Sequence, residues 1–378
     1  MHLLRRLGVL APALVALAVA TLAGASASPA SANPELLVDM NTGEVLYASE
    51  AGVPWHPASL TKLMTAYVAF EAIEAGQVGL ATKVVMSANA AKEPPAKVGL
   101  PVGTAVTLDD ALYLLLVKSA NDMAVAIAET IGGSEGAFVD EMNRAAVTLG
   151  LTATHYDNPN GLDDPAQVTS ARDLAVLALT IRARFPQYDR IFQTDEVLLG
   201  RTRLDSENNL LTEFAGTTGM KTGFICEAGL NIVATAERDG KELMAVILGS
   251  ASSRERGQRA AELLTRGFNG DFPGTGQPVS TLTDHPEIAP VNMRPEICGK
   301  QAAEYRAQHK ADYPYGLEGQ PSFLDARVPP RIHQMLALGR FADVPLPRPR
   351  PNGSAAAPRF ADVIQLFPTP RPRPQTDP

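Results

Sequence analysis

Three short motifs contain residue types that together suit nucleophilic attack on a carbonyl group. A serine hydroxyl is a weak nucleophile until a neighbouring base accepts its proton. A lysine amine is such a base only when desolvation or a second cation lowers its pKa. The motifs therefore predict acyl transfer, with a covalent intermediate on the first serine. In chain order they are Ser59-Leu-Thr-Lys62, Ser119-Ala-Asn121 and Lys221-Thr-Gly223.

The spacing within the first two motifs suggests a role for each catalytic candidate. Positions three apart on a helix share a face, so Lys62 is placed to accept the proton of Ser59. Lys221 is the second cation that lowers the pKa of Lys62. Ser119 relays the proton to the leaving amine, and Asn121 holds Lys62 and the substrate amide. The predicted catalytic residues are Ser59, Lys62, Ser119 and Asn121.

The third motif is expected to bind the substrate. A strand that carries Lys221, Thr222 and Gly223 can pair with an extended peptide, and Thr222 can donate to its terminal carboxylate. The backbone N–H groups of Ser59, at a helix N-terminus, and of Phe224 are candidates for the oxyanion hole.

The elements that must position these motifs alternate between strands and helices. Residues 35–39 and 44–48 predict a hairpin, and a helix is expected from the segment 57–59 to residue 75. Further helices are expected at 108–117, 122–131, 136–149, 171–183 and 254–268, and further strands at 219–223, 230–236 and 243–248.

The pattern predicts an α/β (α+β) fold. Strands from both ends of the catalytic region form one antiparallel sheet flanked by helices, and the middle of the chain forms an all-helical lobe. A cleft between two such lobes is a natural site for a ligand.

The order of the motifs resembles that of penicillin-binding proteins and serine β-lactamases. Longer strings resemble the low-molecular-mass D-alanyl-D-alanine carboxypeptidases of serine peptidase family S11, over residues 36–268. These strings are Pro57-Ala-Ser-Leu-Thr-Lys-Leu-Met-Thr65, Leu116-Val-Lys-Ser-Ala-Asn-Asp122, Asn158-Pro-Asn-Gly-Leu162 and Gly219-Met-Lys-Thr-Gly-Phe224.

The resemblance implies a β-lactamase-like transpeptidase fold. It also implies removal of the terminal D-alanine from peptidoglycan stem pentapeptides through an acyl-enzyme on Ser59. Peptidoglycan peptides are then the substrate and β-lactam antibiotics are covalent inhibitors. By the same analogy Arg254 helps to bind the substrate carboxylate, with Arg256 as the neighbouring candidate.

Two alternative functions use the same residues differently. A DD-endopeptidase or a serine β-lactamase needs the same motifs, but a class A β-lactamase also needs a glutamate that activates the deacylating water. The middle segment has no clear equivalent, and Glu207 and Glu213 follow the helical region. A binding module that has kept the fold without catalysis is the remaining alternative, and the intact motifs argue against it.

The termini suggest export. Arg5 and Arg6 precede an apolar run, and small residues follow, so residues 1–32 are a predicted signal peptide. Cleavage is expected after Ala32, with Ala27 as the second choice, and an uncleaved membrane anchor is the alternative. The mature protein is expected to be periplasmic. Membrane attachment through the apolar positions of 360–367 is not favoured, because Pro368 ends that segment.

Composition indicates which partners, cross-links and cofactors to expect. A net charge of −8 argues against a nucleic-acid partner. Because export leads to an oxidising compartment, Cys226 and Cys298 are predicted to form a disulfide. Scattered histidines indicate no metal site, and no cofactor is expected. Residues 33–270 are the predicted catalytic domain, and residues 271–378 a proline-rich, partly disordered extension.

Overall fold

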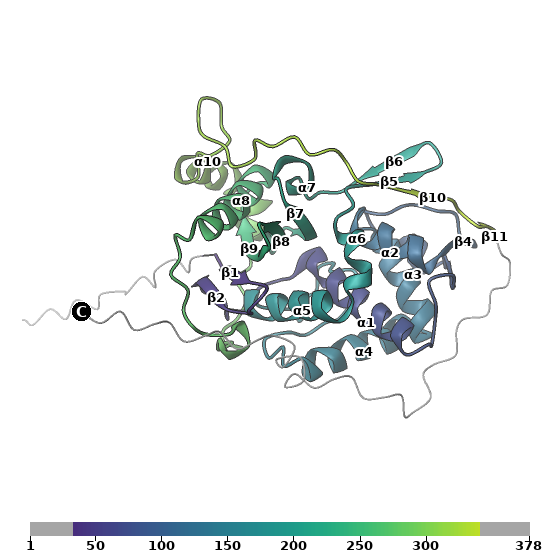
Figure 1. The fold of residues 1–378 in the computed structure, drawn as a ribbon. Coiled ribbons are helices and arrows are strands. Elements are labelled where there is room, and N and C mark those ends of the chain that lie inside the picture. The colour runs from purple at the N-terminus through teal and green to yellow at the C-terminus, as the bar shows by residue number, and fades with distance from the viewer. Residues whose placement is uncertain (1–32, 341–378) are drawn as a thin grey trace, which may run out of the picture. The chain divides into compact units, whose positions relative to one another are not determined.

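The structure is a computed structural model that describes residues 33–340. Its main sheet has five antiparallel strands in the order β2-β1-β9-β8-β7, which brings the beginning and the end of the catalytic region together (Figure 1). The strands are β1 (Glu35–Asp39), β2 (Val45–Ser49), β7 (Thr217–Ile225), β8 (Gly229–Arg238) and β9 (Lys241–Ser250).

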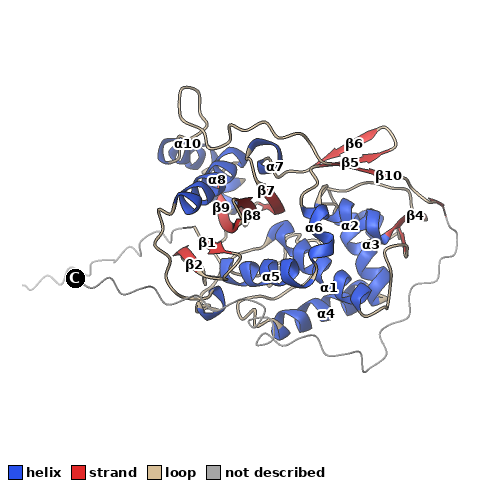
Figure 2. Ribbon diagram, in the orientation of Figure 1, coloured by secondary structure: helices blue, strands red, loops and turns tan. Residues whose placement is uncertain are grey.

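Alternate residues of this sheet face two different cores. On one face Leu37 and Ile247 pack with Leu264 of helix α8 (Ser253–Asn269). On the other face Leu36 and Val246 belong to a larger core that also includes α5 (Ala171–Arg184) and the helical lobe (Figure 2). Successive side chains of a strand point to opposite faces, so both faces of the sheet are buried.

The helical lobe surrounds one buried helix, α1. Its residues from Lys62 to Phe70 are all buried, which is typical of a helix packed on every side. A short 3₁₀ helix precedes it, so the predicted helix over 57–75 begins as a different helix type. The lobe consists of α1 (Lys62–Glu74), α2 (Leu108–Leu116), α3 (Asn121–Gly132), α4 (Glu135–Thr148) and α6 (Asp189–Phe192), with short 3₁₀ helices at Ala58–Thr61, Ala90–Lys92 and Pro186–Tyr188.

The antiparallel sheet with flanking helices and a helical lobe confirms the predicted fold class. Two small sheets were not predicted. They have the strand orders β10-β5-β6 and β11-β4-β3, and each joins the C-terminal segment to a distant part of the chain. Their strands are β3 (Lys83–Val85), β4 (Thr104–Thr107), β5 (Glu196–Leu199), β6 (Thr202–Asp205), β10 (Ile332–Met335) and β11 (Gly339–Arg340).

The segment after residue 270 runs along the catalytic body (Figure 1). It contains a 3₁₀ turn at Val279–Thr281 and the helices α9 (Arg294–Ile297) and α10 (Ala302–Asp312). The predicted Cys226–Cys298 disulfide is present and fastens α9 to the turn after β7. A bridge that closes a loop of 72 residues stabilises the fold by about 4 kcal/mol in the chain-entropy model.

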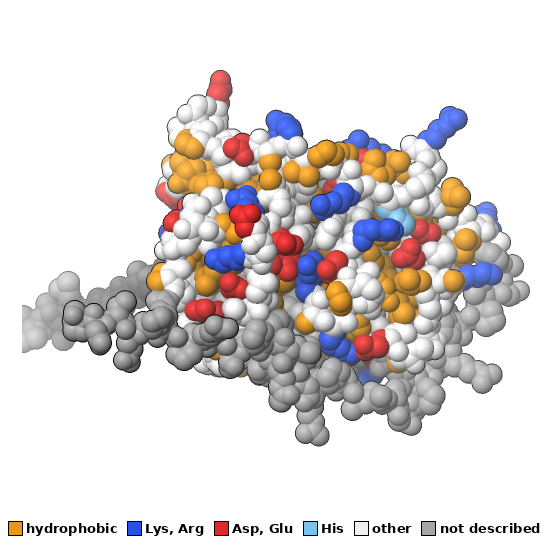
Figure 3. All heavy atoms as spheres, viewed as in Figure 1, with side chains coloured by type: hydrophobic (Ala, Val, Ile, Leu, Met, Phe, Trp, Pro, Cys, Tyr) orange, Lys and Arg blue, Asp and Glu red, His pale blue; other side chains and the backbone are white. Residues whose placement is uncertain are grey.

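Within residues 33–340, no helix is long and apolar enough to cross a membrane. Basic and acidic side chains are interspersed on the face shown in Figure 3. The expected signal segment 1–32 and the proline-rich runs at 347–351 and 368–374 lie outside the described residues.

Candidate active site

Ser59 lies on the 3₁₀ turn that leads into α1, and its neighbours hold this turn tightly. Ala58 has a φ of +50°, a conformation that residues with a Cβ seldom adopt. A Cβ on Gly223 of β7 would lie 3.0 Å from the backbone nitrogen of Ser59. The strand of the third motif therefore packs directly against the turn of the first. Such backbone strain is common at functional sites.

Lys62 is fully buried and its amine has three hydrogen-bond partners. Its Nζ lies 2.8 Å from Ser59 Oγ, 2.8 Å from Asn121 Oδ1 and 2.6 Å from the backbone carbonyl of Asn160. The first two contacts bring together the first and second motifs. The third partner comes from the 158–162 string, to which the sequence analysis assigned no catalytic role.

The electrostatic environment favours a neutral amine at this position. Burial lowers the pKa of Lys62 well below its usual value, and the charge of Lys221 lowers it further. Burial also lowers the pKa of Lys221 to about 7, with Arg256 acting in the same direction. Lys221 donates to the carbonyl of Thr222 and lies inside the fold, so it acts on Lys62 by charge.

Ser119 and Asn121 are fixed at the junction between α2 and α3. Ser119 has a φ of +59°, which turns the chain sharply before α3 begins at Asn121. The Asn121 side chain accepts from Lys62 and donates to the carbonyl of Pro94 at 3.0 Å. The amide of Asn121 is thereby held in one orientation beside the Lys62 amine.

A pocket of about 450 Å³ opens in front of Ser59. One wall is formed by β7, an edge strand of the main sheet whose outer side has no paired strand among residues 33–340. Phe224 projects from this wall with half of its surface exposed. The pocket is lined by Ser59, Pro95, Ala96, Ser119, Asn121, Gly161, Leu162, Glu207, Thr222, Gly223, Phe224, Ile225, Leu230, Ser253 and Arg256.

The two arginine candidates lie on different sides of α8. Arg256 is buried and lines this pocket, where it donates to the backbone carbonyl of Glu207 at 2.6 Å. Arg254 does not line it and instead donates to the carbonyls of Tyr313 and Tyr315. Residues two apart on a helix point in different directions, so only one of them can face the Ser59 pocket.

Asn160 and Glu93 also contribute to the site, although the sequence did not point to either residue. The carbonyl of Asn160 holds Lys62, and its side-chain amide donates to Glu93 at 2.8 Å. Burial raises the pKa of Glu93. The Asn158-Pro-Asn-Gly161 string was a signal for this contact, but nothing in it indicates which segment the turn approaches.

Gly161 sets the position of Ser59, which leads to a prediction. It has a φ of +86°, and a Cβ there would lie 1.9 Å from the carbonyl oxygen of Ala58. We expect Gly161→Ala to slow acylation of Ser59 by about 100-fold, because the turn must shift. Gly200→Ala is the matched control, since Gly200 has a φ of +61° but open space around it. Equal acylation rates in both variants, measured with a fluorescent penicillin, would contradict this role.

Comparison with known proteins identifies the family of this chain. The model of a serine peptidase family described as D-alanyl-D-alanine carboxypeptidase matches residues 21–252. The carboxypeptidase DacC of Escherichia coli strain K12 is 35% identical over 240 residues, which are 62% of this chain and 60% of that protein. The chain thus spans about three fifths of the length of the curated relatives that it matches.

Solved structures share the same fold. Penicillin-binding protein 5 from Haemophilus influenzae is 33% identical, with a TM-score of 0.60 over 63% of this chain and 71% of that one. Penicillin-binding protein D2 from Listeria monocytogenes, solved in the cefotaxime-bound form, is 29% identical, with a TM-score of 0.57 over 63% of this chain and 97% of that one. The family match covers more than half of the chain, so the chain belongs to the S11 family of D-alanyl-D-alanine carboxypeptidases.

Proposed function

We propose that the chain is a serine D-alanyl-D-alanine carboxypeptidase that removes the terminal D-alanine from peptidoglycan stem peptides. The observation that carries this proposal is the buried Lys62 amine at 2.8 Å from the Ser59 hydroxyl. A buried amine whose pKa is lowered well below its usual value is the base that a serine nucleophile requires. The catalytic domain is proposed to comprise residues 33–270, with residues 271–378 as an extension.

In the proposed acylation step, the lone pair of Ser59 Oγ attacks the carbonyl between the two D-alanines. The neutral Lys62 amine accepts the hydroxyl proton. The C–N bond then breaks, and a proton passes through Ser119 to the amine of the departing D-alanine. Water hydrolyses the resulting ester in a second step, and Ser59 regains its proton.

The substrate is proposed to lie in the pocket as an added strand. The free outer side of β7 can pair with an extended peptide, and the N–H groups of Ser59 and Phe224 are the candidate oxyanion hole. The terminal carboxylate is proposed to lie near Thr222 and Arg256, which both line the pocket. Burial lowers the pKa of Arg256 only to about 10, so it remains a cation at neutral pH.

Replacing Arg256 and Arg254 one at a time distinguishes an arginine that binds substrate from one that supports the fold. We expect Arg256→Gln to lower kcat/KM for a D-alanyl-D-alanine peptide by about 100-fold, mainly through KM, because a charge-assisted hydrogen bond to the carboxylate is lost. Arg254→Gln is the matched control and should change kcat/KM little, because Arg254 donates to the carbonyls of Tyr313 and Tyr315 and does not line the Ser59 pocket. The opposite ranking of the two variants in steady-state kinetics would reject Arg256 as the carboxylate ligand.

The proposed function is tested directly by incubating the purified protein with a pentapeptide that ends in D-alanyl-D-alanine. The expected result is release of one D-alanine per peptide, with the tetrapeptide as the other product. A fluorescent penicillin should also label the protein covalently, because the same serine attacks a β-lactam carbonyl. A folded protein that neither releases D-alanine nor becomes labelled would overturn the proposal.

Export follows from the same proposal, because the cell-wall substrate lies outside the cytoplasm. We therefore propose that residues 1–32 are a signal peptide and that the mature periplasmic chain begins at Asn33. N-terminal sequencing of the protein recovered from the periplasm should give Asn33 as the first residue. A chain that keeps its N-terminus in the membrane fraction would contradict cleavage.

A further inference from the structure

One short segment of the chain binds both of the asparagines that hold the catalytic amine of Lys62. The amine donates to Asn121 Oδ1 and to the backbone carbonyl of Asn160. The side-chain amide of Asn121 donates to the carbonyl of Pro94 at 3.0 Å. The side-chain amide of Asn160 donates to Glu93 Oε2 at 2.8 Å. Two consecutive residues therefore fix both of these acceptors of the base.

This segment, residues 93–99, is anchored on α3. Asp122 is fully buried in the first turn of that helix, and its carboxylate accepts from the N–H groups of Val98 at 3.1 Å and Gly99 at 2.8 Å. The backbone carbonyl of Ala96 accepts from the N–H of Asn121 at 2.8 Å. Backbone donors form strong hydrogen bonds with a carboxylate, so the segment is held firmly beside the lysine site.

Glu93 also brings a negative charge to the lysine site. Burial and the charge of Lys221 lower the pKa of Lys62, whereas the carboxylates of Asp122 and Glu93 raise it. Burial raises the pKa of Glu93, as do Glu135 of α4 and Asp122, while its amide hydrogen bond and the charge of Lys62 lower it. The proton affinity of the base is therefore set by burial and Lys221 against two carboxylates.

We propose that Glu93 is a positioning residue for the catalytic base. Its carboxylate fixes the Asn160 amide, and thereby the backbone carbonyl that binds Lys62. Its charge stabilises the ammonium that forms when Lys62 accepts the Ser59 proton. The inference rests on the proposed function, because it assigns a role in the same acylation step.

This role adds no step to the reaction. Ser59 Oγ bonds to the carbonyl carbon while its proton passes to Lys62, and the C–N bond then breaks as the departing nitrogen takes a proton. Between these events Lys62 is a buried ammonium, whose charge is costly inside the fold unless a carboxylate is near. Glu93 does not line the Ser59 pocket, so it acts on the base rather than on the substrate.

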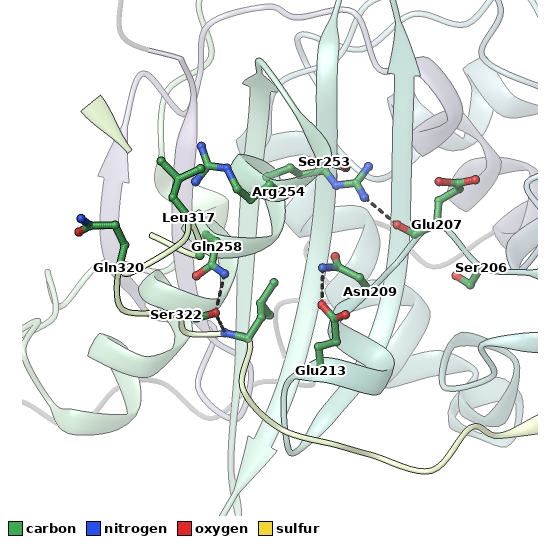
Figure 4. A pocket seen from close by; sticks show the side chains of 13 residues that line it. Ser206, Glu207, Asn209, Glu213, Ser253, Arg254, Gln258, Leu317, Gln320 and Ser322 are labelled. Carbon is green, nitrogen blue, oxygen red and sulfur yellow. Dashed lines mark hydrogen bonds between the residues drawn. The ribbon is translucent and has the colours of Figure 1, made fainter. Parts of the chain in front are cut away.

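The test replaces Glu93 in two ways and follows acylation by a fluorescent penicillin at pH values on both sides of the wild-type midpoint. Glu93→Gln keeps an oxygen that accepts from the Asn160 amide but removes the charge, and Glu93→Ala removes both. Glu213→Gln is the matched control. Glu213 Oε2 accepts from the amide of Asn209 at 2.9 Å, in a pair of the same kind that does not line the Ser59 pocket (Figure 4).

Glu93→Gln is expected to be acylated up to about threefold faster than the wild type below the midpoint, because the amine loses its proton at lower pH without the carboxylate. Above the midpoint its rate should lie within about twofold of the wild type. Glu93→Ala should be about tenfold slower there, since the freed Asn160 carbonyl no longer orients the amine. Glu213→Gln should follow the wild-type profile, and a cooperative thermal unfolding transition shows that each variant is folded.

Overlapping pH profiles for Glu93→Gln and the wild type would show that the carboxylate charge does not act on the base, and would overturn the inference. A wild-type rate for Glu93→Ala, or the same change of profile in Glu213→Gln, would also overturn it. In these cases the wild type is acylated, so the proposed function still stands. A wild-type protein that is not acylated at any pH removes the inference together with the proposed function.

Discussion

Replacement of Ser59 by alanine is expected to lower the rate of D-alanine release by at least about 10⁴-fold, because Ser59 is the proposed nucleophile and no other residue is proposed to attack the carbonyl. Lys62 keeps its contacts with Asn121 and Asn160 when the hydroxyl is removed. The fold should therefore survive, and the thermal unfolding temperature should change little.

The matched control for this variant is Ser253→Ala. Ser253 lines the same pocket and has no assigned role in catalysis. The rate of D-alanine release by Ser253→Ala should be close to the wild-type rate. Release should be followed over hours, so that slow turnover by the Ser59→Ala protein is also detected. A Ser59→Ala protein that keeps a substantial rate would show that another residue attacks the carbonyl.

The second large effect is expected for Lys62→Arg, which replaces the base with a permanent cation. A guanidinium remains protonated at any working pH, so it cannot accept the Ser59 proton. Loss of a general base slows a reaction by about 10² to 10⁴-fold, and we expect about 10³-fold for acylation of Ser59 by a penicillin. If Lys62 acted only as a positive charge, this variant would keep most of the wild-type rate.

Two further variants make this result interpretable. Lys62→Met removes the amine without adding a charge or extra bulk. It should be as slow as Lys62→Arg, which shows that the effect of arginine does not come from its larger size. Lys92→Arg exchanges an exposed lysine and should match the wild type. In the wild type, acylation should rise as the pH rises through the lowered pKa of Lys62, because only the neutral amine is active.

Sequence patterns predicted the local parts of this site well. The contact between Ser59 and Lys62 spans three residues of one turn, so the spacing alone placed the two side chains together. The main sheet was predictable because its strands are apolar and its β8–β9 hairpin is joined by the Arg238–Lys241 turn. The positions of α2 to α5 followed from their apolar periodicity for the same local reason.

The features that sequence patterns missed depend on tertiary contacts. The carbonyl of Asn160 lies 98 residues from Lys62 in the chain, and a backbone acceptor leaves no trace in residue type. The choice between Arg254 and Arg256 depends on how α8 is rotated over the sheet, which the motif cannot indicate. Strands β10 and β11 pair with β5 and β4 far upstream, and neither carries an apolar pattern long enough to detect.

The most direct measurement is the location of the covalent adduct after treatment of the protein with benzylpenicillin. The β-lactam ring opens by addition, so the protein should gain the full mass of one penicillin. After digestion, mass spectrometry should find this adduct on Ser59 in the wild type and no adduct at the same exposure in Lys62→Arg. An adduct on any other residue, or equal labelling of both proteins, would contradict activation of Ser59 by a neutral Lys62 amine.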